Sequence, residues 1–358
     1  MPFRELDNYL TGLVDKTKIP GFVCWVGNLS ASFFLRTHGY AQLKPQKVQI
    51  KKDTVFDLAS LTKPLVTALS VMLLHEDKSL SIDQTLDTLL PVFIRTPSAR
   101  KTVRQLLTHT AGLPAWHPIY LFPEDKRLRY LAGLNTPTKE PVYSCLGYLI
   151  LGKLIEHVST TPLDCFFKQR ITRELGLHTL GFGPVFDRNT AAATEDGNEH
   201  ERKMASRHGD ISNIKWREYL IQGEVHDGNA YYGYNGIAGN SGLFSNLPDL
   251  ITLTRAYLSA EILKPSTLSM MTSEYVGSNE KRNLGWHADP YPGLLSPTSF
   301  GHTGFTGTMI TIDPRTNLII ILLANAIHPK VQLGLMQPIR HAVVRIIAKT
   351  MRSKNTKL

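Results

Sequence analysis

Apolar residues at the N-terminal end of the chain follow two periods, one typical of helices and one typical of strands. Those that start at Phe3 recur on one helical face, which predicts an opening helix that ends at about Lys18. Aromatic and β-branched residues then fill 22–26 and 33–36, on either side of the turn-forming segment 27–30. We therefore expect a β-hairpin directly after the first helix.

The C-terminal end carries the same kinds of element in the opposite order. Segments 308–312 and 318–323 have the composition of strands and flank 313–317, a short polar segment that contains a proline and an asparagine. The apolar positions from 331 to 351 return to a helical period. The pattern predicts a second hairpin followed by a final helix.

Helical patterns and loops dominate the middle of the chain. Helices are predicted at 64–75, 102–108, 146–158, 163–175 and 248–258. Long segments between them, such as 116–126 and 195–227, are interpreted as loops.

Strands at both ends with helices between them indicate an α+β fold. We expect one antiparallel sheet built from both chain ends, flanked by the terminal helices, with a large and mostly helical insert. The predicted division places residues 1–58 and 230–358 in the sheet domain and residues 59–229 in the helical domain. A substrate cleft is expected between the two domains.

The chain has 358 residues, of which 42% are apolar and 20% are charged, as is ordinary for a folded globular protein. The first ten residues include acids and no continuous apolar core, so a secretory signal is not expected. No stretch approaches about 18 uninterrupted apolar residues, so no membrane span is expected. The three cysteines are unevenly spaced, which favours a reduced, cytoplasmic setting.

The net charge of +10 raises the question of an anionic partner such as nucleic acid or a membrane surface. Six lysines and arginines lie between Arg340 and Lys357, among apolar residues at helical spacing. A basic amphipathic helix can lie on a membrane. We favour a terminal helix that packs its apolar stripe on the body of the protein, and we expect no nucleic-acid partner.

Ser60 and Lys63 are the strongest candidates for chemistry. They occupy positions i and i+3 where a helix is predicted to begin, so the lysine nitrogen can contact the serine oxygen. Such a contact can activate a serine without a histidine. The same spacing occurs at Ser98 and Ser278, but only Ser60 opens a long apolar helix. The alternative is an ordinary serine at a helix start.

Other candidate motifs fail on their context. Residues 147–153 match the spacing of a phosphate-binding loop, but Leu154 replaces the hydroxyl residue that would hold magnesium. Ser241 is a rival nucleophile, yet Leu243 breaks the Gly-x-Ser-x-Gly pattern. No His-Glu-x-x-His or clustered cysteine and histidine spacing indicates zinc. We therefore expect no cofactor and no metal.

Two further segments carry candidate site residues. Tyr143 lies at the entrance of the helix predicted near Leu146, and a neighbouring lysine ammonium would lower the pKa of its phenol and make it a usable base. Taken alone, Tyr143 is more often a packing residue. The segment 301–308, Gly-His-Thr-Gly-Phe-Thr-Gly-Thr, allows a substrate to approach the backbone closely at the start of a strand.

Taken together, Ser60-x-x-Lys63, Tyr143-Ser-Cys145 and His302-Thr303-Gly304 resemble, in order and context, the serine β-lactamase and penicillin-binding-protein superfamily. The resemblance is to the class C β-lactamase-like branch, which includes family VIII carboxylesterases and D-amino-acid peptidases. The segments 106–114, 223–227 and 238–245 are similar to the same branch. The resemblance extends from about residue 10 to about residue 347.

This resemblance implies a role for each matching residue. Ser60 would be the acylated nucleophile, Lys63 its activator and Tyr143 the base that later protonates the leaving group. The backbone N–H groups of Ser60 and Phe305 would form the oxyanion hole. His302, Thr303, Gly304 and Cys145 would contact the substrate.

The sequence departs from the β-lactamase pattern at two positions. Cys145 stands where an asparagine usually hydrogen-bonds the substrate, and it offers only a weak S–H donor. His302 stands where many β-lactamases have a lysine, so a permanent cation is replaced by a side chain that is mostly neutral at pH 7. Attraction for a substrate carboxylate should be weaker, which favours uncharged esters.

We therefore expect a cofactor-free serine acyl hydrolase that acts on small esters through an acyl-enzyme on Ser60. One alternative is amide hydrolysis, as in a β-lactamase or a D-alanyl peptidase. Another is a catalytically silent binding or scaffold protein that keeps the fold.

Overall fold

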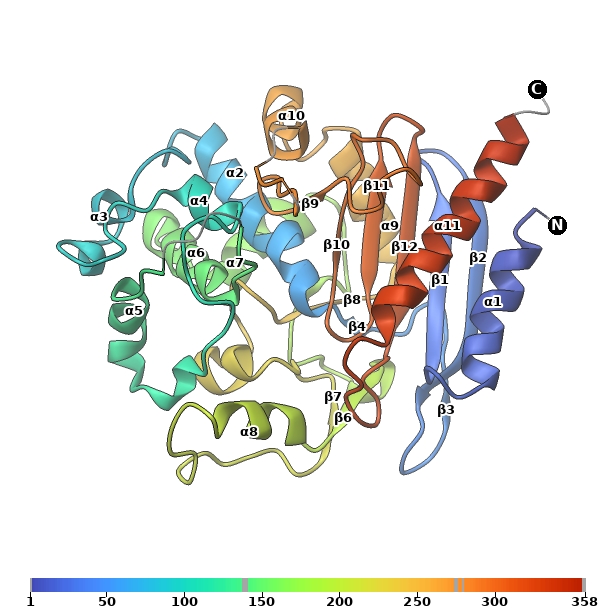
Figure 1. Cartoon of the computed structure of the whole chain (residues 1–358), viewed down its shortest axis with the longest axis horizontal. Helices are drawn as coiled ribbons and strands as arrows, with labels where there is room; N and C mark the ends of the chain where they lie inside the picture. Colours follow the sequence, from blue (N-terminus) through green and yellow to red (C-terminus); the bar gives the residue numbers. More distant parts are fainter. Residues whose placement is uncertain (1, 137–140, 274–275, 279, 356–358) are drawn as a thin grey trace.

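A computed structural model describes residues 2–136, 141–273, 276–278 and 280–355. Its largest element is a seven-stranded antiparallel sheet with the strand order β3-β2-β1-β12-β11-β10-β9 (Figure 1). The strands are β1 (Gly21–Gly27), β2 (Ser32–Gln42), β3 (Val48–Gln49), β9 (His287–Ala288), β10 (Phe300–Thr303), β11 (Met309–Asp313) and β12 (Leu318–Ala324). The two predicted terminal hairpins are confirmed, and pairing of β1 with β12 joins them. The α+β fold class is therefore confirmed.

Strand β1 shows why the centre of the sheet is buried on both faces. Val23 and Trp25 face one hydrophobic cluster, and Phe22 and Cys24 face another, as expected from the alternation of side chains along a strand. All four side chains have no exposed surface. Such a strand has a continuous apolar sequence rather than an alternating one.

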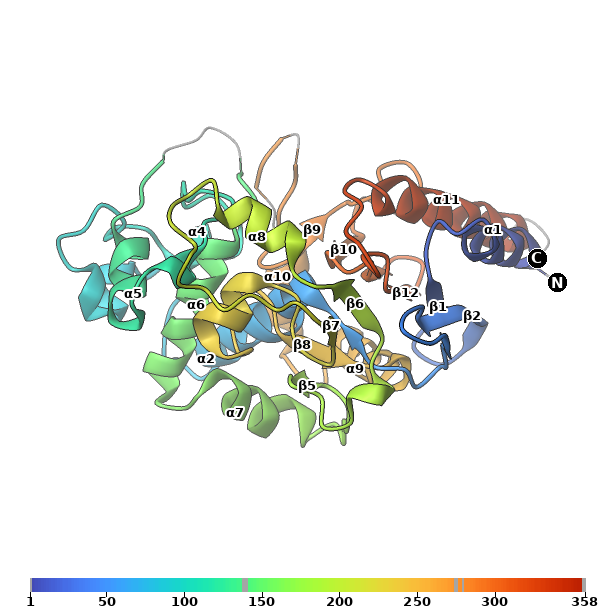
Figure 2. The same cartoon turned by 90° about the horizontal axis from the view of Figure 1, so that it is seen from below.

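Helices α1 (Arg4–Asp15) and α11 (Met336–Asn355) lie side by side over one face of the sheet (Figures 1 and 2). The prediction that α11 packs its apolar stripe on the body is confirmed, because Val343 and Ile347 are fully buried against residues of α1 and the sheet. Lys357 lies outside the described residues. The predicted start of this helix at 331 is wrong, since 331–335 form a loop with Gly334 in a left-handed conformation before α11 begins.

The opposite face of the sheet is covered by α9 (Leu247–Leu258) and by the helical part of the chain (Figure 2). Predicted helices are present as a π-helical segment, Lys63–Ala68, that continues into α2 (Leu69–Glu76), and as α4 (Val103–Leu107) and α6 (Cys145–Ser159). The predicted helix 163–175 is α7 (Leu163–Phe167) followed by a π-helical turn, Lys168–Thr172. The short helix α3 spans Leu86–Leu89. The division into domains at 58 and 230 remains a prediction.

Besides the short α3, three α-helices of the described residues were not predicted: α5 (Glu124–Ala132), α8 (Glu199–Ala205) and α10 (Pro265–Ser273). The first two lie at least partly in segments interpreted as loops. Helix α5 carries acids in its first turn after Pro123, which is a helix-start signal that the apolar period alone does not show. Helix α8 is polar on most of its surface, so it lacks an apolar stripe.

Five short strands complete the part of the fold that the structure describes. Strands β4 (Phe56–Asp57), β8 (Leu243–Ser245) and β5 (Gly181–Phe182) form one small sheet, and β6 (Ala193–Asp196) pairs with β7 (Leu220–Gln222). Strand β4 is important for the site because the chain passes from it directly into the turn that carries Ser60. Within the described residues, no helix combines the length and the apolarity needed to cross a membrane.

We expect Ile347→Ala to lower the free energy of unfolding by about 2–5 kcal/mol, because it leaves a cavity between α11 and the sheet. Arg345→Ala, on the exposed side of the same helix, should change it by less than about 0.5 kcal/mol. Chemical denaturation measures both values. Equal stability of the two variants would contradict the packing of α11 on the sheet.

Candidate active site

Ser60 lies in a tight turn between β4 and the helical segment that follows. The turn Ala59–Leu61 is a 3₁₀ helix, and Ala59 has a φ of 47°, which is unfavourable for a residue with a side chain. The carboxylate of Asp57 accepts a hydrogen bond of 2.8 Å from the N–H of Ala59 and holds this turn. Sequence reasoning assigned no role to Asp57, although a carboxylate two residues before a strained position is typical of a local turn.

The predicted contact between Ser60 and Lys63 is present. Lys63 has no exposed surface, and its Nζ donates to Ser60 Oγ over 2.9 Å and to the backbone oxygen of Asn240 over 3.0 Å. Ser60 is partly exposed. The lysine is thus held behind the serine, and only the hydroxyl faces the substrate side.

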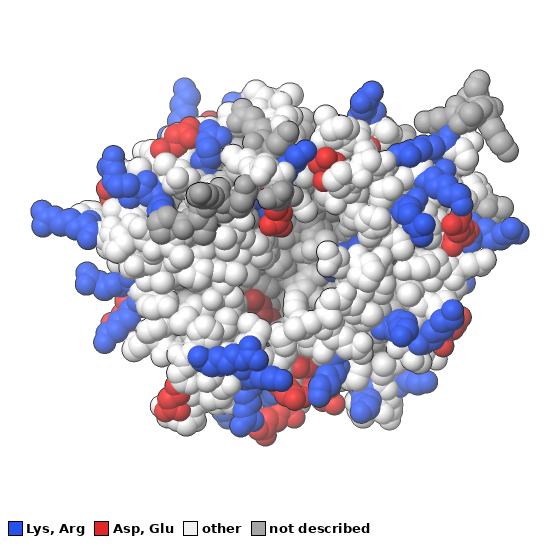
Figure 3. All heavy atoms as spheres, in the orientation of Figure 1, with Lys and Arg blue, Asp and Glu red and all other residues white. Residues whose placement is uncertain are grey.

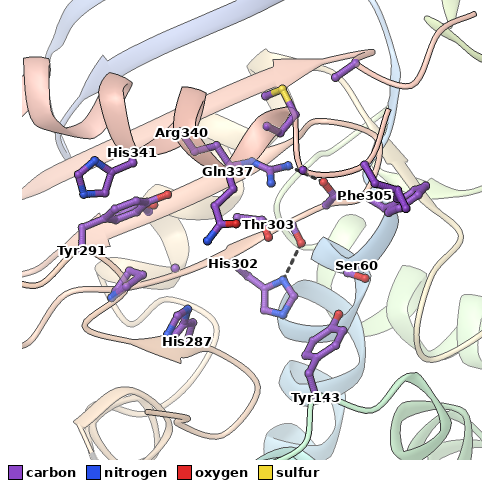
Figure 4. A pocket seen from close by; sticks show the side chains of 18 of the residues that line it. Ser60, Tyr143, His287, Tyr291, His302, Thr303, Phe305, Gln337, Arg340 and His341 are labelled. Atoms are coloured by element: carbon purple, nitrogen blue, oxygen red, sulfur yellow. Dashed lines mark hydrogen bonds between the residues drawn. The ribbon is translucent and has the colours of Figure 1, made fainter. Parts of the chain in front are cut away.

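Tyr143 reaches the same place from the entrance of α6. The side chain of Ser144 caps this helix by accepting from the N–H of Gly147. The ring centre of Tyr143 lies 5.0 Å from Lys63 Nζ, and its phenol oxygen points toward Ser60 (Figure 4). The structure therefore brings Ser60, Lys63 and Tyr143 together.

His109 holds Tyr143 in position and was missed by sequence reasoning. Its backbone oxygen accepts from the N–H of Val142, and its Nδ1 accepts from the N–H of Ser144 over 3.0 Å. The ring also packs on Tyr143, with 4.7 Å between ring centres. Because a backbone N–H can only donate, Nδ1 carries no hydrogen, so the ring is neutral with its hydrogen on Nε2. The sequence did contain a signal for His109, because it lies in the segment 106–114 that is similar to the family. That similarity assigned no role to any residue of the segment.

The protonation states of Lys63 and Tyr143 follow from their burial and their proximity. Burial disfavours the charged form of Lys63, but the negative forms of Cys145 and Tyr143 favour it, and the net effect raises the pKa of Lys63. Burial also raises the pKa of Tyr143 and outweighs the lowering by Lys63. The expected lowering of the Tyr143 pKa is therefore wrong. At neutral pH, Lys63 is an ammonium and Tyr143 is a neutral phenol.

The predicted substrate-contacting segment forms the opposite wall of the site. His302 and Thr303 end β10, and Gly304 and Phe305 follow in the turn toward β11. A side chain on Gly304 would collide with the backbone oxygen of Leu58 at 2.5 Å, so only glycine allows this turn to approach the turn that carries Ser60.

His302 is nearly buried and neutral. Its Nδ1 donates to the backbone oxygen of Thr303 over 2.9 Å. Burial, aided by the nearby charges of Arg282 and Lys63, holds the pKa of His302 well below its usual range. The surroundings of His302 therefore keep it neutral. This agrees with the expectation that a neutral side chain replaces a permanent cation at this position.

Cys145 is the first residue of α6 and lies beside Lys63. Burial raises the pKa of its thiol, and this outweighs the opposing effect of Lys63. The group is therefore a thiol at neutral pH and not a thiolate nucleophile.

A cavity of about 630 Å³ opens beside Ser60 and extends along β10 toward the start of α11 (Figure 4). Figure 3 shows the surface hollowed at the boundary between the helical part and the sheet. Residues 331–334, in the loop that precedes α11, line this cavity. Loops and edges that meet here come from distant parts of the chain, as is common for substrate sites.

Arg282 also lines the cavity and was not found from the sequence. Its side chain is only 7% exposed and forms an ion pair with Glu280, whose side chain is 44% exposed. The guanidinium carbon lies 5.2 Å from the centre of the Tyr143 ring. A permanent positive charge is therefore present in the cavity, although it comes from a different segment than the sequence pattern suggested.

The side chains of the site can supply nucleophilic chemistry. Within the described residues, no group of three or more histidine, cysteine, aspartate or glutamate side chains could hold a metal ion. A serine hydroxyl, a lysine and a tyrosine in mutual contact can move a proton away from the serine and return it to a leaving group. Such a site is typical of serine hydrolases with the β-lactamase and transpeptidase fold.

The sequence matches the Beta-lactamase family from residue 6 to residue 342, so the chain belongs to that family. It is 31% identical over 327 residues to a putative D-alanyl-D-alanine carboxypeptidase of Escherichia coli (strain K12), which covers 81% of this chain and 73% of the relative. It is also 31% identical over 330 residues to an N-acetylmuramyl-L-alanine amidase of Bacillus subtilis (strain 168), with 81% and 72% covered.

Solved structures share the fold at lower sequence identity. EstCE1, a hydrolase with promiscuous acyltransferase activity, superimposes with a TM-score of 0.73 at 20% identity, over 97% of this chain and 98% of the other. A class C β-lactamase from Rhodobacter sphaeroides gives a TM-score of 0.73 at 19% identity, with the same coverage. These similarities confirm the predicted fold. The family match over residues 6–342 confirms the superfamily inferred from the sequence.

The raised pKa values of Lys63 and Tyr143 predict a direction for the pH dependence of activity. A group with a raised pKa releases its proton only at higher pH, so the form that can accept the Ser60 proton is scarce at neutral pH. We expect kcat/KM for an activated ester to rise continuously from about pH 6 to about pH 9. Stopped-flow or plate-reader pH profiles measure this, with spontaneous ester hydrolysis subtracted. A profile that is flat or falls over this range would contradict these protonation states.

Proposed function

We propose that the protein is a serine acyl hydrolase that acts on small esters through an acyl-enzyme on Ser60. The observation that carries the proposal is the buried Lys63 ammonium, which donates to Ser60 Oγ over 2.9 Å while the Tyr143 ring lies 5.0 Å away. A helix-start serine with only a structural role would not need a fully buried lysine behind it.

In the proposed reaction, Ser60 Oγ attacks the carbonyl carbon of the ester. Its proton passes to the pair formed by Lys63 and Tyr143 after that pair has released one proton. Tyr143 then protonates the leaving alcohol as the bond between carbonyl carbon and alcohol oxygen breaks. Water attacks the acyl-enzyme by the reverse route and releases the acid.

The backbone N–H groups of Ser60 and Phe305 are proposed as the oxyanion hole. Both residues line the same cavity. Among the described residues, no acceptor takes a hydrogen bond from the N–H of Phe305, so this donor is available to a substrate. Two such donors stabilise the negative oxygen that develops in the transition state.

Two features support uncharged esters over amides. His302 is neutral at pH 7, so it offers no ionic attraction to a carboxylate beside Thr303. Cys145 presents a thiol where β-lactamases carry an amide that hydrogen-bonds the substrate.

A second candidate function is hydrolysis of an amide whose product carries a carboxylate, and Arg282 is the observation that favours it. This buried arginine places a permanent charge in the cavity beside Tyr143. Its Nε is buried without a hydrogen-bond partner among the described residues. The two relatives described above are named for amide-bond hydrolysis, which agrees with this alternative.

Ser60→Ala should abolish covalent labelling by a fluorophosphonate and turnover of p-nitrophenyl esters. Ser241→Ala serves as the matched control, because Ser241 is a serine near the site that is only 2% exposed. Intact-mass spectrometry should show one adduct on the wild type and on Ser241→Ala and none on Ser60→Ala. Failure of the wild type to react would favour a catalytically silent protein, and labelling of Ser60→Ala would exclude Ser60 as the nucleophile.

A matched pair of substrates separates the two candidate functions. We expect p-nitrophenyl acetate to be hydrolysed with a higher kcat/KM than nitrocefin or an acylated D-alanyl-D-alanine dipeptide. The second candidate predicts instead that the dipeptide with a free carboxylate is cleaved faster than the same dipeptide capped as an amide. That preference should disappear in Arg282→Gln and persist in Arg345→Gln, an exposed control.

A further inference from the structure

The two donors of the proposed oxyanion hole belong to segments that are far apart in the sequence. Ser60 lies in the turn after β4, and Phe305 lies in the turn between β10 and β11. A displacement of about 1 Å between catalytic groups can cost about 100-fold in rate. Something must therefore hold these two turns at a constant separation.

Two threonine hydroxyls connect the turns directly. Thr306 Oγ1 donates to the backbone oxygen of Asp57 over 2.7 Å, and Thr308 Oγ1 donates to the backbone oxygen of Leu58 over 3.2 Å. Both threonines are essentially buried, with 2% and 0% of their surface exposed. The turn that carries Phe305 is thus bonded to the two residues that precede Ala59 and Ser60.

The carboxylate of Asp57 secures the other side of this connection. One oxygen accepts from the N–H of Ala59 over 2.8 Å, and the other accepts from the N–H of His226 over 2.7 Å. The first bond holds Ala59 in its left-handed conformation, which sets the direction of the next N–H, that of Ser60. Asp57 is 2% exposed, so both bonds are protected from water.

His226 extends the connection to the side chain of Phe305. The two rings are stacked, with 5.7 Å between centres and 22° between planes. The His226 ring is itself held by Glu195 over 2.9 Å. Asp57 therefore contacts the nucleophile turn through its side chain, and it reaches the Phe305 turn both through its backbone oxygen and through His226.

We propose that Asp57, Thr306 and Thr308 form a clamp that sets the separation and direction of the Ser60 and Phe305 N–H groups. Asp57 is a positioning residue in this proposal, because it contacts no reacting atom. The inference rests on the proposed function, since it assumes that these two N–H groups bind the developing oxyanion. The clamp gives a structural role to three buried polar side chains that take no part in the catalytic steps.

The test replaces both threonines with valine, which has the same shape but lacks the hydroxyl. Thr254→Val is the matched control, because Thr254 is equally buried and donates to the backbone oxygen of Leu250 over 2.7 Å in α9. We expect the double variant Thr306→Val/Thr308→Val to lose about 10- to 100-fold in kcat with KM within about twofold. Its affinity for phenylboronic acid, which forms a tetrahedral adduct with the serine, should fall by a similar factor.

Asp57→Asn provides an independent measurement. The amide keeps one acceptor but turns an NH₂ donor toward the other backbone N–H, so one of the two bonds must break. We expect kcat to fall more than KM rises, with a parallel loss of boronate affinity. If the double threonine variant does not fold, the two single variants are measured, and each should show part of the loss.

The outcomes separate this inference from the proposed function. If the wild type forms no fluorophosphonate adduct, the proposed function fails. If the wild type reacts and the threonine variants keep the kcat and boronate affinity of Thr254→Val, only the clamp is overturned. A loss confined to thermal stability, with unchanged kcat and boronate affinity in the folded fraction, would also overturn the clamp.

Discussion

Lys63 carries its ammonium group in the interior of the protein, and the geometry of the site depends on how that charge is held. An ammonium with no exposed surface is costly unless polar groups replace the water it has lost. Within the described residues, no carboxylate lies within ion-pair distance of Lys63 Nζ. The hydroxyl of Ser60 and the backbone oxygen of Asn240 accept its hydrogen bonds, and the Tyr143 ring lies beside it. Two of these three groups, Ser60 and Tyr143, are also the groups with which Lys63 would exchange a proton in the proposed reaction.

This arrangement requires three segments to meet. Ser60 and Lys63 come from the start of the helical part, Tyr143 from the entrance of α6, and Asn240 from the segment before β8. Hydrogen bonds hold two of these segments in place. Asp57 accepts one from the turn of Ser60, and His109 accepts one from the backbone next to Tyr143. The end of β10 and the turn that follows it then close the site, and Gly304 allows this turn to approach the turn that carries Ser60. The fold thus supplies a rigid frame around one buried charge.

The charge of the cavity depends on residues that are far apart in the sequence. His302 is neutral because it is buried near the positive charges of Arg282 and Lys63. Arg282 lines the same cavity and carries a permanent positive charge, which its ion pair with Glu280 partly balances. A change of one motif residue, from lysine to histidine, therefore does not by itself define the charge of the cavity. In the proposed function, the distinction between esters and carboxylate-bearing amides depends on the position of Arg282 as much as on His302.

The sequence by itself determined the elements with a strong period, namely the two terminal hairpins and the helices α1, α2, α6 and α9, because an apolar stripe or strand must be buried against a partner. It also determined the contact between Ser60 and Lys63, which is local and follows from helical spacing. Only the tertiary structure decided the net pKa of Tyr143, since burial depends on the whole surrounding shell and here outweighs the nearby ammonium. The same holds for Arg282, His109 and the bonds from Thr306 and Thr308 to the nucleophile turn. These join residues that are distant along the chain, and their distances are set by how the sheet and the helices pack.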